Sequence, residues 1–261
     1  MDLNIVRLRI PLTAAGEQRL VVALTSQRAS IEQHLASLCT RSLSSDPELV
    51  RRHQKPGLPF VFSLPHCGML DCLLVGPAIA ELSSVVTMVV DRGGMTSPCQ
   101  LFALDYQGGN VIQRPGGGDE LPVLSLAGLL DLATPRYTAC KRLQVQLQTP
   151  LRLVAAGREL RQFEPVRFVR GVLRRFSSLV AYYGIAGDPE TFIRLADLAG
   201  RMQVVAARPL SVPQGQRGVL GSFEMQGPCE DLGPILELGA LLHLGKGASF
   251  GMGAFQIRPL S

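Results

Sequence analysis

Residues 244–257 read LGKGASFGMGAFQI, a stretch with four glycines in two pairs that runs into alternating apolar residues. The glycines are Gly245, Gly247, Gly251 and Gly253. Glycine lets a backbone approach a ligand closely at positive φ, and exposed amides beside a cation such as Lys246 can bind phosphate. A tight turn with a bulge before an edge strand explains the same glycines equally well. The spacing fits neither the dinucleotide fingerprint GxGxxG nor the GxxxxGK loop of nucleoside triphosphatases, so neither of those sites is expected.

The segments around this stretch repeat one order of elements in the two halves of the chain. Alternating apolar residues predict strands at 4–12, 59–65, 100–106, 142–154, 217–227 and 253–257. Apolar residues three and four apart predict helices at 26–43, 77–90, 119–133 and 165–184, and a short helix or extended run at 233–247. Each half then reads as strand, helix and two strands, which favours an α+β fold of two tandem ferredoxin-like domains with antiparallel sheets.

Three glycines directly after Pro115 mark a boundary between the two halves. We therefore expect an N-terminal ferredoxin-like domain at 1–115 and a connecting segment at 116–139. The C-terminal ferredoxin-like domain, which carries the glycine-rich loop, is expected at 140–261.

The composition suits a globular protein with a basic balance. Of the 261 residues 46% are hydrophobic, and the formal net charge is +5 with a pI near 9.1. The most apolar stretch, at 70–90, is interrupted by Pro77 and Glu81, so no membrane span is expected. Charged residues also interrupt the N-terminus, which argues against a signal peptide and favours a cytoplasmic protein. The six cysteines form no CxxC pair, so we expect reduced thiols, no bound metal and no cofactor.

Arginines gather between residues 158 and 175. This stretch holds six arginines and two glutamates, hence a net +4 of the whole chain's +5. On a helix Arg167, Arg170 and Arg174 fall on one face, opposite an apolar face. A solvated helix face explains these arginines simply, whereas a row of like charges costs repulsion and favours a bound polyanion.

His34 lies on the first predicted helix, at one edge of its apolar stripe. Arg41 follows seven residues later, two helical turns on, so it lies at the same edge. A half-exposed imidazole beside a cation can transfer a proton near neutral pH, but a surface histidine without a catalytic role fits this position too. The cases for His53 and His66 are weaker, and the apolar run around His243 indicates a structural role.

Residues 242–257, LHLGKGASFGMGAFQI, resemble the C-terminal signature of the CRISPR-associated endoribonucleases that process precursor crRNA, members of the RAMP superfamily. Residues 144–157 resemble the strand that opens the second half in this family, and 168–184 resemble the helix after it. Residues 217–227 resemble the strand that precedes the glycine-rich loop in this family. In the first half, residues 58–65 and 73–106 are also similar to segments of the family.

The resemblance implies two tandem ferredoxin-like domains that bind CRISPR repeat RNA and cut it without a metal. The ribose 2′-hydroxyl attacks the adjacent phosphate, which leaves a 2′,3′-cyclic phosphate and a 5′-hydroxyl, and the enzyme is expected to stay bound to the mature crRNA. Family members often carry a histidine where His34 stands, and Arg28, Arg41 and Lys55 are the nearby cations that would stabilise the phosphorane. The expected RNA contacts are Arg167, Arg170, Arg174, Arg175, Arg217, Gly245, Lys246, Gly247, Gly251 and Gly253.

The chain also departs from the family pattern. Arg28 is followed by Ala29 where the family has an arginine–glycine pair, and the first tyrosine, Tyr106, is far from His34 in sequence. The short first half and the many arginines suit a divergent branch such as that of type IV systems. Two alternatives stay open: a non-catalytic RAMP subunit that holds the guide RNA beside other subunits of a CRISPR ribonucleoprotein complex, and an unrelated metabolic α+β enzyme whose glycine segment binds a phosphorylated ligand.

Overall fold

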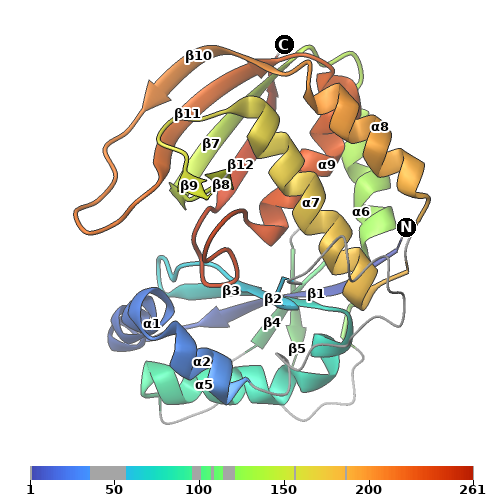
Figure 1. The fold of residues 1–261 in the computed structure, drawn as a ribbon. Coiled ribbons are helices and arrows are strands. Elements are labelled where there is room, and N and C mark those ends of the chain that lie inside the picture. The colour runs from blue at the N-terminus through green and yellow to red at the C-terminus, as the bar shows by residue number, and fades with distance from the viewer. Residues whose placement is uncertain are drawn as a thin grey trace.

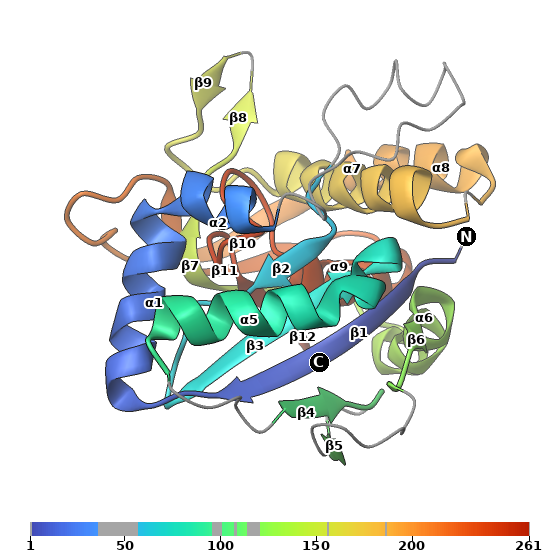
Figure 2. The ribbon, with the colours of Figure 1, turned by 90° about the horizontal axis from the view of Figure 1, so that it is seen from below.

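The computed structural model of the chain describes residues 2–35, 57–95, 101–106, 109–113, 121–155, 157–185 and 187–260. Its elements form two halves, each built on an antiparallel sheet, and the first half lies below the second in Figure 1. A separate hairpin of β8 (Val154–Ala155) and β9 (Arg158–Glu159) projects from the second half. Figure 2 shows this hairpin standing away from both sheets.

The first half folds around β1 (Asn4–Pro11), a strand of alternating residues that pairs with β3 (Met69–Val75) so that Leu8 lies opposite Cys72. Its other strands are β2 (Phe60–Phe62), β4 (Leu101–Leu104), β5 (Asn110–Gln113) and β6 (Leu124–Ser125). The order across the sheet is β2-β3-β1-β4-β5, and β6 also pairs with β1. The helices of this half are α1 (Ala14–Ser26), α2 (Arg28–His34), η1 (Gly76–Glu81) and α5 (Leu82–Gly93). The helices α1 and α5 pack together on one face of the sheet (Figure 2).

The second half folds around β7 (Arg142–Leu151), whose buried Leu143, Val145 and Leu147 alternate with glutamines. Its other strands are β10 (Gln203–Pro209), β11 (Val219–Gln226) and β12 (Phe255–Leu260), in the order β10-β11-β7-β12. Its helices are α7 (Pro165–Tyr183), α8 (Pro189–Ala199) and α9 (Cys229–Leu242), which lie on one side of the sheet in Figure 1. Between the halves, α6 (Leu126–Ala133) and η2 (Thr134–Tyr137) pack against α9.

Both halves have the ferredoxin-like order of elements. In the first, β1, α1, β2, β3, α5 and β4 follow one another, and the fourth strand lies beside the first. In the second, β7, α7, β10, β11, α9 and β12 do the same. The predicted fold class, two tandem ferredoxin-like units with antiparallel sheets, is therefore confirmed.

Several elements differ from the sequence-based expectation. The helix expected at 26–43 begins earlier, as α1, because the Thr13 hydroxyl accepts a hydrogen bond from the amide of Gly16 (3.0 Å) and caps the helix there. The next helix, α2, ends at His34, and residues 36–56 lie outside the described part. The strand β10 was not expected, since nearly all its residues are exposed and it has no apolar alternation. The helix α8 was also missed.

An apolar core joins the two halves. One buried cluster contains Leu3 and Ile5 from the first half together with Phe168 and Phe255 from the second half. The segment expected to connect the domains contributes to both sides, because β6 pairs with β1 while Tyr137 packs against α9 at Gly233. Within the described residues, no helix has the length and apolar character needed to cross a membrane.

Candidate nucleic-acid interface

The helix α7 presents an apolar face to the core and a basic face outward. Phe168, Val169 and Val172 are buried, whereas Arg167, Arg170 and Arg174 are exposed. Proline at its first position and glycine directly after its last residue bound the helix, as is usual for helix ends. The spacing of three and four residues therefore places the three arginines along one ridge.

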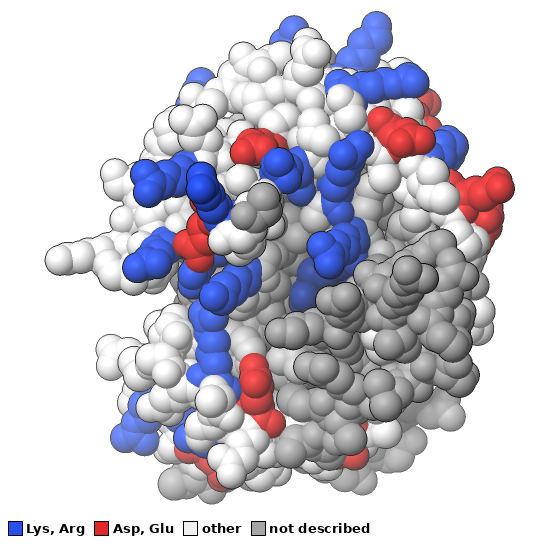
Figure 3. Space-filling model, viewed as in Figure 1, with Lys and Arg blue, Asp and Glu red and all other residues white. Residues whose placement is uncertain are grey.

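Two of the three exposed arginines hydrogen-bond to neighbouring residues. Arg167 donates to the Glu164 carboxylate (2.7 Å) one turn earlier, and Nε of Arg170 donates to the carbonyl of Ala196 on α8 (3.2 Å). All three line a cavity of about 670 Å³ between α7, the β8–β9 hairpin and Leu244–Gly245. Lys and Arg side chains gather over these elements in the middle of the face shown in Figure 3, and extend from there toward α2.

Arg175 differs from the other arginines of α7. Its Nε donates to the carbonyl of Leu242 at the end of α9 (2.7 Å), and Nη2 donates to the Ser249 hydroxyl (3.4 Å). Burial lowers the pKa of this guanidinium to about 10. Arg175 thus ties α7 to the end of α9 and to the glycine segment, while its side chain forms part of the cavity wall.

The glycine segment, residues 243–254, joins α9 to β12 and has one exposed tip. Lys246 is exposed and its flanking glycines, Gly245 and Gly247, are partly exposed, whereas residues 248–254 are buried. The amide of Lys246 donates to the carbonyl of Arg152 (2.9 Å), which fixes the tip beside the end of β7. Both flanking glycines have positive φ, 87° and 85°, so the tip has a backbone that other residues rarely adopt.

The second pair of glycines lies in the interior. Gly251 (φ 85°) packs its backbone against Leu64, and Gly253 (φ 64°) packs against the carbonyl of Leu244, so neither position has room for a side chain. Because both are buried, we restrict the expected phosphate contact to the tip at Gly245–Gly247. The structural-turn explanation accounts for Gly251 and Gly253.

The glycine segment also contacts the first half of the chain. The amide of Phe62 donates to the carbonyl of Ser249 (3.0 Å), and the Phe250 ring packs edge-on against Phe60. Arg28, the first residue of α2, lies over the Phe250 ring at 5.8 Å and beside the tip, where a Cβ on Gly247 would lie 2.6 Å from its Nη1. Burial lowers the pKa of Arg28, and the charge of Arg152 lowers it further.

Of the other residues expected at the catalytic centre, the structure describes His34 but not Arg41 or Lys55. His34 is exposed at the last position of α2, six residues after Arg28, so the two side chains leave the helix about 120° apart. Arg41 and Lys55 lie outside the described residues. The structure therefore brings Arg28 to the glycine tip and leaves His34 at the outer end of the same helix.

Arg152 and Glu159 lie beside the glycine tip, although neither is among the RNA contacts expected from the sequence. Nε of Arg152 donates to the Glu159 carboxylate (3.1 Å), and Nη2 forms an ion pair with the same oxygen. This hydrogen bond holds the pKa of the Glu159 carboxyl below its usual value, and the charges of Arg217 and Lys246 act in the same direction. In the sequence, Arg152 is a charged residue between Leu151 and Leu153 at the end of an alternating strand. This pattern is only a weak indication of a functional residue.

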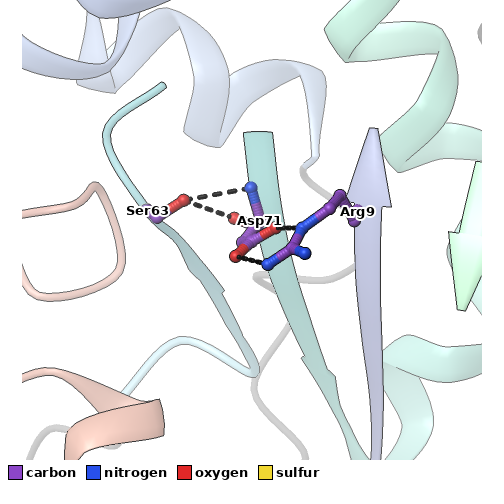
Figure 4. Close-up of polar contacts among 3 residues, drawn as sticks. All are labelled: Arg9, Ser63 and Asp71. Carbon is purple, nitrogen blue, oxygen red and sulfur yellow. Dashed lines mark hydrogen bonds and ion pairs between the residues drawn. The ribbon is translucent and has the colours of Figure 1, made fainter. Parts of the chain in front are cut away.

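A second polar cluster lies on the sheet of the first half. Arg9 on β1 donates to both oxygens of Asp71 on β3 (2.7 and 2.9 Å), and the Ser63 hydroxyl bonds to the backbone of Asp71 (Figure 4). Because Arg9 engages both oxygens of this carboxylate, we assign the cluster a structural role. Among the described residues, no three His, Cys, Asp or Glu side chains are grouped as metal ligands.

Comparisons with known proteins find similarity to one family. Residues 145–255 match the model of the CRISPR-associated endoribonuclease Cas6, which confirms the resemblance seen in the sequence. A Cas6 substrate mimic complex is 17% identical, with a TM-score of 0.56 over 98% of this chain and 99% of that chain. Cas6 from Thermus thermophilus is 17% identical, with a TM-score of 0.52 over 100% and 98%. A partial Cas6-RT-Cas1–Cas2 complex is 14% identical, with 0.59 over 99% and 46%. No curated protein matches the sequence.

Proposed function

Because residues 145–255 match the CRISPR-associated endoribonuclease Cas6 and the whole chain has the fold of Cas6 structures, we propose that this protein binds CRISPR repeat RNA and cleaves it in precursor crRNA. The reaction is metal-independent, occurs in the cytoplasm, and leaves a 2′,3′-cyclic phosphate and a 5′-hydroxyl. The protein then stays bound to the mature crRNA and can pass it to other subunits of a CRISPR ribonucleoprotein complex.

One observation carries this proposal: cations from distant parts of the sequence converge on the glycine tip. Arg28 comes from α2 of the first half, Arg152 from the end of β7, and Lys246 from the tip itself. The ridge of Arg167, Arg170 and Arg174 lines the adjoining cavity. A polyanion bound along this surface would contact cations from both halves. Such a row of cations suits the repeated phosphates of an RNA backbone.

The chemistry assigned to the site follows from these charges. Attack of the 2′-hydroxyl on the phosphate needs a base, an acid for the 5′-oxygen and cations beside the phosphorane oxygens. Arg28 and Lys246 supply positive charge at the tip. His34 is the proposed proton-transfer group, and Arg41 and Lys55 remain proposed as further cations.

The test is incubation of the purified protein with RNA of the repeat from its own CRISPR array, in the presence of EDTA. We expect cleavage at one position in the repeat. Tight binding without cleavage would instead support the non-catalytic RAMP subunit. Failure to bind the repeat RNA would contradict both RNA-binding functions and favour the metabolic enzyme.

A further inference from the structure

Glu159 lies among cations contributed by four separate segments. Its carboxylate oxygen Oε1 accepts from Arg152, which follows β7. Arg217, before β11, and Lys246, at the glycine tip, are close enough to act on its charge. Arg28 of α2 completes the group through its proximity to Arg152. The four cations therefore face two described carboxylates, Glu159 beside Arg152 and Glu32 near Arg28.

This balance leaves an excess of positive charge at the glycine tip. Like charges at close range destabilise one another, as the effect of Arg152 on Arg28 indicates. The fold nevertheless brings these cations together from four segments. A backbone hydrogen bond from the Lys246 amide to the Arg152 carbonyl (2.9 Å) keeps these two residues side by side. Such an arrangement suits a bound anion with more charge, or more oxygens, than one carboxylate provides.

A carboxylate and a phosphodiester offer the same kind of acceptor to a guanidinium. Each presents oxygens that the planar fork of an arginine can engage through parallel hydrogen bonds. In the free protein both donors of Arg152 point to Oε1 of Glu159. An RNA phosphate that reached Arg152 would need these donors for itself.

We propose that the Glu159 carboxylate occupies a phosphodiester site in the free protein, and that an RNA phosphate displaces it from Arg152 on binding. This inference rests on the proposed RNA-binding function and adds the position of one phosphate and the group that competes with it. Glu159 lies on β9, which pairs with β8 in a sheet of two strands. Because isolated two-stranded hairpins are held weakly, the carboxylate can leave without disturbing either large sheet.

Competition by Glu159 has a consequence for specificity. A ligand must replace an ion pair before it engages Arg152, so a short anion with few other contacts is disfavoured. RNA that also contacts the α7 ridge makes enough other contacts to displace the carboxylate. Glu159 thus acts as a specificity-determining residue against small phosphates.

The experiment compares Glu159→Gln with the control Asp231→Asn. The control removes an exposed carboxylate on α9, which pairs with Arg194 of α8 at 3.3 Å. The probe is a labelled stem-loop RNA with 2′-O-methyl riboses, which cannot be cut by 2′-hydroxyl attack. Glu159→Gln should tighten binding about threefold, the scale of an exposed ion pair, and Asp231→Asn should leave it nearly unchanged. In an Arg152→Gln background the gain from Glu159→Gln should vanish, because the site of competition is gone.

A second probe, inorganic pyrophosphate, separates this inference from the proposed function. Its affinity for the protein is measured by calorimetry. Tighter pyrophosphate binding by Glu159→Gln supports the phosphate site even if the wild-type protein fails to bind the RNA, a failure that would contradict the RNA-binding function alone. Equal affinities of Glu159→Gln and Asp231→Asn for both probes would overturn the inference and leave the proposed function intact. A gain that persists in the Arg152→Gln background would also overturn it.

Discussion

At the scale of single residues, the site depends on two features of the glycine tip. One is its backbone with positive φ, and the other is the neighbouring side chain that packs against it. Gly247 illustrates both, since its φ is 85° and its open side is filled by the guanidinium of Arg28. Lys246 between the two glycines is held by its amide, which leaves its ammonium group exposed. Substitutions here can separate backbone strain from loss of contact.

Replacing Gly247 with alanine tests that separation. Both Gly247→Ala and the control Gly215→Ala (φ 80°, with open space around the added Cβ) should cost about 1–2 kcal/mol of strain. Gly247→Ala should also displace Arg28 and weaken RNA binding, whereas Gly215→Ala should leave affinity unchanged. Thermal unfolding and RNA titration measure the two effects, and equal affinities of the two variants would contradict the placement of Arg28 at the tip.

Replacing His34 tests the proposed proton transfer. His34→Ala should slow single-turnover cleavage by about 100-fold or more, the usual contribution of a general acid or base, with little change in RNA affinity. The neighbouring exposed residue on α2 gives the control, Gln33→Ala, which should cut at the wild-type rate. An unchanged rate for His34→Ala would assign the chemistry to the cations instead.

At the scale of elements, α7 is the clearest example of a sequence pattern with a structural outcome. Its apolar residues recur at three and four positions, so the buried face and the arginine ridge were both predictable before the structure. The strand β7 was predictable for the same reason, because its alternation is strict. By contrast, β10 carries no alternation to read, since it is an exposed edge strand.

The contacts within the site were less predictable than its elements. Arg175 has the same sequence context as Arg174, yet it donates to Leu242 and Ser249 while Arg174 is exposed. Only the packing of α7 on α9 distinguishes them. Arg152 and Glu159 meet across the short β8–β9 hairpin, whose two-residue strands are too short to show an alternating pattern.

Replacing Arg174 tests the function of the ridge. Arg174→Ala should weaken RNA binding and lower the slope of log affinity against log salt by about 0.7–0.9, the contribution of one phosphate contact. Arg194→Ala provides the control, since Arg194 is also an exposed arginine but lies on α8 and pairs with Asp231. Equal slopes for Arg174→Ala and the wild-type protein would remove Arg174 from the RNA-binding surface.

At the scale of the whole molecule, the glycine segment connects the two ferredoxin-like halves. It leaves α9 at His243, contacts β2 through Ser249 and Phe250, and returns to the second sheet as β12. Residues from both halves share one buried cluster beside it. The site therefore exists only when the halves are packed together, so its integrity is coupled to overall stability.

The pH dependence of stability should report this junction. Burial, together with the charge of Arg175, lowers the pKa of His243 from 6.5 to about 4 in the folded protein. The unfolded chain therefore takes up a proton as pH falls below about 6.5, which the folded protein does not bind until about pH 4. The contribution of His243 to stability should be constant above this window and fall by about 2 kcal/mol between pH 7 and pH 5.

Denaturant unfolding at the two pH values measures this loss. His243→Asn removes the titrating group and, like histidine, carries a Cβ at this positive φ of 53°, so its stability should change less between pH 7 and pH 5. The same pH dependence in the variant and the wild-type protein would contradict the role of His243.

The central claim is that the ribose 2′-hydroxyl of bound repeat RNA attacks the neighbouring phosphate at this interface. The most direct measurement compares single-turnover cleavage of two repeat RNAs in EDTA, one all-ribose and one with a single 2′-deoxy nucleotide on the 5′ side of the cut. We predict cleavage of the first, with a 2′,3′-cyclic phosphate detected by mass spectrometry, and no cleavage of the second despite equal binding. Cleavage of the 2′-deoxy RNA at the same position would contradict the account.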